Sequence, residues 1–140
     1  NAALGAAPGH AGHLFFPSGP QGSANDRHPA DNPFMRSLAG GKTWTPVAGV
    51  LEAHAFGFGK GTGANPALLV VGWVKGQYGV WRSEDDAATW TRIGDFPLGI
   101  LASVGAVSGD GDDPALAYVG FRGAGYAVFG ASGAASAPPP

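Results

Sequence analysis

Two short segments of the sequence carry residue types that could bind a metal ion or a phosphate. His10 and His13 could ligate one metal if they shared a helical turn or had a third ligand, and neither condition is apparent. Residues 57–63 are rich in glycine like a phosphate-binding loop, but Asn65-Pro66 and an apolar strand follow where such a loop needs a helix N-terminus. We therefore expect a hairpin loop at 57–63, and neither a metal nor a cofactor.

The acidic run 110–113 is a third candidate for an ion site. A twelve-residue calcium loop that begins at Asp110 needs a glutamate at its twelfth position, which is Phe121 in this sequence. We expect a solvated turn there. The absence of cysteine excludes disulfides and thiolate metal sites, and eight Lys and Arg against ten Asp and Glu provide no basic surface for nucleic acid. No apolar run approaches the roughly 20 residues that span a bilayer.

Glycine and proline decide which elements must position these residues. The 140 residues include 25 Gly and 12 Pro, yet 44% are hydrophobic and 11% aromatic, which is not the composition of a disordered chain. Glycine costs roughly 1 kcal/mol and proline roughly 3 kcal/mol in a helix interior, and no stretch of helical apolar spacing escapes them. The sequence therefore predicts an all-β protein with many tight turns.

A repeat with a period of 46 residues runs through the chain. Residues 34–45 align without a gap on residues 80–91, with Arg, Ser, Thr, Trp and Thr in common. Each copy has the pattern of a hairpin, and further strand candidates are residues 13–16, 54–58, 67–73, 102–107, 115–119 and 125–129. Four strands in such a unit are typical of a β-propeller blade, so we expect about two and a half blades of four antiparallel strands.

The repeat divides the chain into five expected regions. They are a disordered segment or partial strand over 1–9, a blade over 10–51, a second blade over 52–98, a partial terminal blade over 99–130 and a linker over 131–140. The linker is expected because residues 131–140 are only Ala, Ser, Gly and Pro.

The turn in each copy resembles the Asp box, S-x-D-x-G-x-T-W, of sialidase-like propellers. The matching residues are Ser37, Gly41, Thr43 and Trp44 in the first copy and Ser83, Asp85, Thr89 and Trp90 in the second. In those families the box is a structural turn opposite the active site. We expect Asp85 to accept hydrogen bonds from its own turn and Trp90 to pack across the next blade. The first turn should be looser, because Ala39 replaces its aspartate.

The order of other segments resembles the C-terminal blades of glycoside hydrolase family 74, which are xyloglucanases and related β-1,4-glucanases. The segments are 52–60, 65–68, 71–74, 78–83, 90–95 and 109–126, the last with a Tyr-Val-Gly-x-x-Gly-x-Gly stretch. The departures are an insertion at 111–113, a long polar loop at 21–32 and the missing aspartate of the first box. The resemblance implies that the blades belong to a seven-bladed propeller. In the family, two such propellers face each other across a glucan-binding cleft.

The same resemblance implies inverting hydrolysis by two aspartates, a general acid and a general base. In the family both precede the terminal blades, and no position of this chain matches either motif. The implied function is therefore that of a C-terminal propeller portion of a secreted bacterial hydrolase of xyloglucan or a related β-1,4-glucan, inactive alone. Its partners would be the polysaccharide and the remaining propeller blades. The alternative is a non-catalytic sialidase-like propeller that binds a protein or peptide.

Six residues are expected to contact the glucan if the strands connect as in other propellers. Loops between second and third strands, and between fourth and first, then lie on the face opposite the Asp boxes. The six are Trp73, Gln77, Tyr78, Arg122, Glu52 and His54, with Lys75, Asp95, Phe96 and the loop 21–32 on the same face. An aromatic ring would stack on a glucose unit while Glu52 or Gln77 bonds hydroxyls.

Packing is the alternative role of several of these side chains. Trp73 and Tyr78 stand at strand ends, where aromatic residues often pack against a neighbouring element. Trp81 is expected to pack between blades, and Arg36 and Arg82 to bond the backbone of the next blade.

Overall fold

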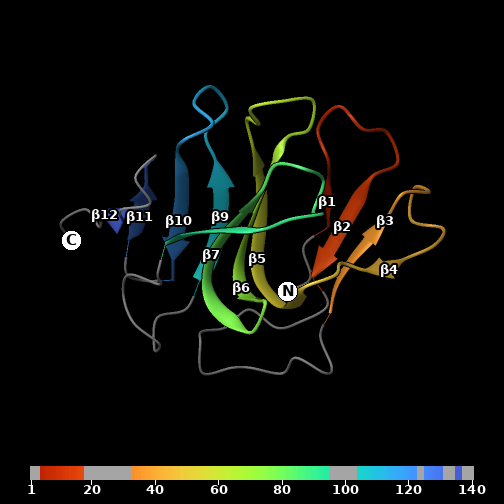
Figure 1. Ribbon diagram of the computed structural model, residues 1–140, viewed down its shortest axis with the longest axis horizontal. Helices are drawn as coiled ribbons and strands as arrows, with labels where there is room; N and C mark the ends of the chain where they lie inside the picture. The colour runs from red at the N-terminus through yellow and green to blue at the C-terminus, as the bar shows by residue number, and fades with distance from the viewer. Residues whose placement is uncertain (1–3, 18–32, 95–103, 123–124, 131–134, 137–140) are drawn as a thin grey trace.

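The computed structural model describes residues 4–17, 33–94, 104–122, 125–130 and 135–136 as three antiparallel sheets side by side (Figure 1). The first sheet comprises β1 (Gly5–Ala6), β2 (Leu14–Pro17), β3 (Phe34–Ser37) and β4 (Thr45–Pro46); the second β5 (Val50–Gly59), β6 (Ala67–Val74), β7 (Gln77–Ser83) and β8 (Thr91–Gly94); the third β9 (Val104–Gly109), β10 (Ala117–Phe121), β11 (Tyr126–Phe129) and β12 (Ala135–Ser136). The described residues include no helix that could cross a membrane.

Each sheet is a meander whose four strands pair in chain order, which is the arrangement of a propeller blade. The predicted all-β class and the expected blades of antiparallel strands are confirmed. The third sheet also has a fourth strand, β12, which lies within the expected linker 131–140 and pairs its two residues with Phe129 and Val128.

The 46-residue repeat is also a repeat of backbone conformation. Gly40 and Gly41 in the first turn have φ angles of 65° and 90°, and the aligned residues Asp86 and Ala87 have 60° and 67°. A left-handed conformation costs a non-glycine residue roughly 1–2 kcal/mol. The methyl group of Ala87 is buried between the first two sheets, and this packing offsets part of that cost.

The chain has one apolar core on each side of the second sheet. Alternation along β6 sends Leu68 and Val70 toward the first sheet and Leu69 and Val71 toward the third. Because β6 is buried on both faces, its sequence is one continuous apolar run.

The first of these cores locates the tryptophans of the second sheet. Trp81 is buried there together with Phe15 and Phe34, so the prediction that it packs between blades is confirmed. Trp90 lies in the same core and packs toward the preceding sheet, not the next one, so that part of the expectation was wrong. Trp90 directly precedes β8, and the sequence pattern does not specify toward which of the two neighbouring sheets its side chain points.

A polar cluster joins the first two sheets beside this core. Arg36 Nη1 donates a hydrogen bond to the Asp86 carbonyl oxygen at 2.7 Å and lies 3.3 Å from its carboxylate. His13 Nε2 lies 3.3 Å from the same carboxylate. The expectation that Arg36 bonds the backbone of the next blade is confirmed.

His13 should make the stability of the chain depend on pH. Burial lowers the pKa of His13 below its ordinary 6.5, and Arg36 and His10 act in the same direction, while Asp86 opposes them. The unfolded state therefore binds the proton more readily, so the free energy of unfolding should fall as the pH drops through about 6.5. Urea unfolding above and below this pH should show a smaller pH effect in His13→Gln, and an unchanged effect would contradict the assignment.

Candidate functional site

A tight hairpin at one end of the second sheet carries three of the six residues expected to bind a ligand. We call residues 73–78 the hairpin platform. Its turn consists of Lys75 and Gly76 with φ angles of 52° and 78°, the left-handed pair typical of a type I′ hairpin. The β7 strand begins in this hairpin and ends at the turn of Asp85, so the platform and the Asp-box turn lie at opposite ends of the sheet.

Three hydrogen bonds from outside the turn hold the platform. The Lys75 N–H donates to the Gly49 carbonyl oxygen at 2.8 Å, which ties the hairpin to the connection before β5. Arg92 Nη2 donates to the Tyr78 carbonyl at 2.5 Å, and Trp81 Nε1 donates to that of Gln77 at 3.3 Å. The platform is thus fixed by the connection before β5, by β8 and by its own strand β7, as a preorganised binding surface requires.

Beneath the platform lies a buried polar network. His54 Nε2 is 2.9 Å from Glu52 Oε1, and His54 Nδ1 is 3.2 Å from the Tyr78 hydroxyl. The Tyr78 ring in turn contacts the Trp73 ring edge to face, with centroids 5.5 Å apart. Four of the six residues expected to bind the glucan therefore form one contiguous group.

The exposure of the six residues divides them into two kinds. Gln77 and Arg122 are exposed and Trp73 is half-buried, whereas Tyr78, Glu52 and His54 are 8%, 0% and 2% exposed. In this conformation the Glu52 carboxylate is held by His54 and not presented to solvent. Arg122 belongs to the third sheet, directly after β10.

The residues were predictable from the sequence, but their hydrogen-bonded network was not. Glu52 and His54 are two positions apart on one strand, which places both on one face of an ideal strand and was a usable sign. The obstacle is that β5 has irregular pairing between Val50 and Glu52 and between Ala53 and Ala55. Asp95, Phe96 and the loop 21–32 lie outside the described residues.

The turn at the opposite end of the second sheet has the hydrogen bonds expected of it. Asp85 Oδ1 accepts from the Thr89 N–H at 2.8 Å and from Ser83 Oγ at 2.9 Å, and the Thr89 hydroxyl donates to Oδ2. In the first turn Ser37 Oγ accepts from the N–H groups of Ala39 and Gly41 at 3.2 and 2.9 Å. The first turn thus keeps the serine bonds and lacks the carboxylate bonds.

Asp85 should stabilise its turn only in the ionised state. The Thr89 hydroxyl, then the Thr89 N–H and the Ser83 hydroxyl, lower the pKa of Asp85 from 3.8 to about 2. The stabilisation is therefore complete above pH 3.8 and is lost as the pH falls through about 2. Asp85→Asn should lower the melting temperature near neutral pH, and this difference should shrink in acid. Asp112→Asn, at an exposed position, is the control, and an equal effect of both variants would contradict the role.

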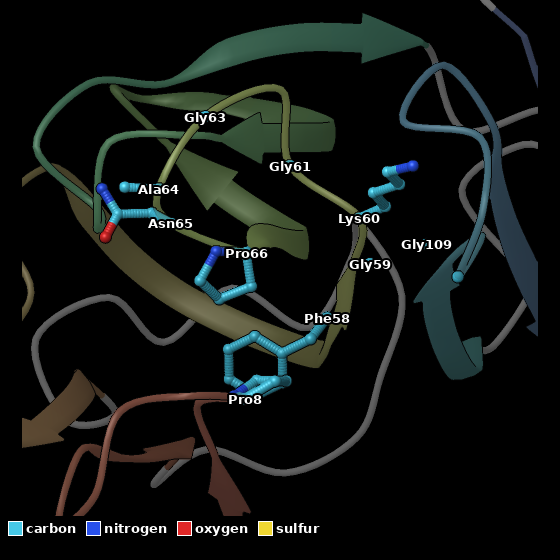
Figure 2. A pocket seen from close by; sticks show the side chains of 11 residues that line it. Pro8, Phe58, Gly59, Lys60, Gly61, Gly63, Ala64, Asn65, Pro66 and Gly109 are labelled. Atoms are coloured by element: carbon cyan, nitrogen blue, oxygen red, sulfur yellow. The ribbon is translucent and has the colours of Figure 1, made fainter.

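A hollow of about 560 Å³ opens at the Asp-box end, between the β5–β6 and β9–β10 connections. Figure 2 shows Phe58, Pro8 and Pro66 along it, with Lys60 and Asn65 as its polar side chains. Residues 60–66 connect the antiparallel strands β5 and β6, so a hairpin loop is present, but residues 57–59 of the expected loop 57–63 belong to β5 and pair with β6. This hollow lies at the end away from the platform.

The two remaining candidates for ion sites have other partners. Asp110 Oδ1 accepts from the N–H groups of Asp112 and Asp113 at 2.8 and 2.9 Å, which makes the acidic run a self-bonded turn. His13 contacts Asp86, as described above. Within the described ranges, no three His, Asp or Glu side chains are grouped as a metal site would require.

The chain is similar to segments of longer proteins. No family model matches the chain. A xyloglucanase of Paenibacillus sp is 35% identical over 127 residues, which are 89% of this chain and 12% of that protein. A Niastella koreensis GH74 enzyme superposes with a TM-score of 0.70 and 25% identity, over 91% of this chain and 18% of its own. The GH74 xyloglucanase of Xanthomonas campestris gives 0.63 and 31%, over 90% and 16%. The chain therefore spans less than a fifth of each relative.

Proposed function

Because this chain is similar in sequence and fold to a segment of the family 74 glycoside hydrolases, xyloglucanases among them, we propose that it supplies propeller blades to a larger secreted enzyme of that kind. The substrate is xyloglucan or a related β-1,4-glucan. Two aspartates outside this chain act as general acid and general base. The observation that carries the proposal is a likeness that covers about nine-tenths of this chain in both sequence and structure.

The hairpin platform is the part of the chain that we assign to the glucan. It lies at the end of the sheet opposite the Asp-box turn, and its Trp73 ring is half-buried while Gln77 is exposed. An indole ring offers a flat apolar surface to the apolar face of a sugar ring, and an amide bonds hydroxyl groups. Arg122 of the third sheet adds a donor. Glu52 and His54 support the platform from below.

The outer face of the first sheet is assigned to another blade of the same enzyme. It has an apolar hollow of about 430 Å³ lined by Leu4, Phe16, Met35 and Trp44. Met35 and Trp44 align in the repeat with Trp81 and Trp90, which are 5% and 6% exposed because they pack onto the first sheet. A preceding blade would bury Met35 and Trp44 in the same way, which supports a position inside a longer propeller.

Removal of the indole tests the platform. Trp73→Ala should weaken binding of a xyloglucan oligosaccharide by about tenfold in calorimetric titration, because the stacking surface is lost. Trp44→Ala is the matched control. It removes another half-buried tryptophan, which lies at the Asp-box turn of the first sheet and therefore away from the platform. Equal affinity in wild type and Trp73→Ala would contradict the assignment of the platform, and a wild-type chain that does not bind the oligosaccharide would favour the alternative of a peptide-binding propeller. The 140-residue chain should not hydrolyse xyloglucan, and turnover would show that its catalytic groups lie within it.

A further inference from the structure

The buried network beneath the platform has a role beyond stabilising the fold. We propose that Glu52, His54 and Tyr78 are positioning residues that hold the Trp73 indole in the orientation in which it stacks on a sugar ring. This inference rests on the proposed function, since it takes the platform as a glucan contact. It assigns a role to three side chains that do not reach the ligand themselves.

Sheet pairing places Trp73 between two members of the network. Its backbone partner on β5 is Glu52 and its partner on β7 is Tyr78. The Tyr78 ring lies 5.5 Å from the Trp73 ring at an interplanar angle of 66°, and 5.6 Å from the His54 ring. A shift of the tyrosine ring would therefore displace the indole that packs against its side.

The distances in the network allow an arrangement of protons that uses both imidazole nitrogens. With the proton on His54 Nε2, that nitrogen donates to Glu52 Oε1 at 2.9 Å, and Nδ1 accepts from the Tyr78 hydroxyl at 3.2 Å. Both ring nitrogens are then used. The His54 ring cannot rotate without breaking its bonds to Glu52 and Tyr78. Glu52 therefore holds the His54 ring in place, and the His54 ring holds the Tyr78 hydroxyl.

Burial of this network is expensive, which argues for a use beyond packing. The side chains of Glu52 and His54 are both 0% exposed. Apolar residues of similar volume often replace buried charged or polar groups with no loss of stability. Glu52 and His54 lie beside Trp73, the most exposed indole of the second sheet. Their burial is better explained by a role in orienting this indole than by a gain in stability.

The irregular pairing of β5 supports the same role. Register shifts occur between Val50 and Glu52 and between Ala53 and Ala55, on both sides of the Glu52 backbone. Bulges redirect side chains and are enriched next to binding sites. Here they accompany the segment that carries Glu52 and His54 into the sheet edge under the platform.

Graded variants of the 140-residue chain separate orientation from folding. Tyr78→Phe removes only the hydroxyl, Glu52→Leu removes the acceptor for His54, and Glu52→Gln keeps an acceptor oxygen of the same reach. Binding of a xyloglucan oligosaccharide should weaken about threefold in Tyr78→Phe and about tenfold in Glu52→Leu, while Glu52→Gln should stay within about twofold of wild type. The near-ultraviolet circular dichroism of Trp73, isolated by subtracting the spectrum of Trp73→Phe, should change in the first two variants and persist in the third.

The outcomes distinguish this inference from the proposed function. If Trp73→Ala weakens binding while Tyr78→Phe and Glu52→Leu change neither affinity nor the Trp73 spectrum, the positioning role is overturned and the platform remains. If Trp73→Ala has no effect on affinity, the assignment of the platform to the glucan fails, and the inference falls with it because Trp73 is not a sugar contact. If Glu52→Leu does not fold, Tyr78→Phe against Glu52→Gln decides the question by the same two measurements.

Discussion

Replacement of Gly57 by alanine is expected to destabilise the chain by about 3 kcal/mol or more. A Cβ atom at this position would lie 2.0 Å from the Val107 carbonyl oxygen and 3.3 Å from the Ser108 Cα. The obstacles are backbone atoms of β9, which cannot move aside as the end of a flexible side chain does. The methyl group would therefore push β5 and β9 apart, and with them the second and third sheets.

Urea unfolding of Gly57→Ala should give a clearly lower midpoint than wild type. Gly63→Ala is the matched control, because a Cβ there meets nothing within 4 Å and the position has no left-handed backbone. The control should unfold like wild type. Equal urea midpoints for both variants would show that β5 and β9 are farther apart than the structure places them.

Truncation of Phe34 to alanine should cost about 3–5 kcal/mol of stability. Phe34 is 0% exposed and lies at the centre of the core between the first two sheets. Its ring stacks on Phe15 with centroids 5.4 Å apart and meets Phe56 of the second sheet at 5.2 Å. The cavity left by its removal would separate aromatic rings from two blades, and their packing cannot collapse around it without moving a sheet.

Phe16→Ala is the internal comparison for this measurement. Phe16 lies on β2, the strand that pairs with the strand of Phe34, but it lines the hollow on the outer face of the first sheet. In the 140-residue chain its removal should cost less than half as much as the removal of Phe34, because its ring is only partly buried. Equal losses would contradict the assignment of Phe34 to the core and Phe16 to the open face.

Much of the fold was predictable because its signals are local. The strands β3 and β7 were found from one alignment of residues 34–45 with 80–91, and each is followed by a turn whose serine bonds its own backbone. The apolar run of β6 and the glycine-rich hairpins likewise depend on nearest neighbours in the chain. Residues close in sequence carried these features, so a single sequence sufficed to locate them.

The direction of packing was less predictable. The sequence indicates that Trp90 is an interface residue, but which blade receives it depends on the twist and stacking of whole sheets. For Arg36 the contact with the next blade was predicted but its partner was not, because Asp86 is fifty residues away and is brought near by the contact of two blades. Such pairs are set by the geometry between sheets, on which no local pattern reports.

The sequence by itself determined the blade architecture, the two turns and the family likeness, because period, turn residues and motif order are properties of the linear chain. Only the tertiary structure decided where the six candidate residues lie and which partners they have. It placed Gln77 and Arg122 on the surface and buried Glu52 and His54 as partners under Trp73. The physical reason is that burial and hydrogen-bond partners depend on strand register, and the two irregularities in β5 change that register at the residues that matter.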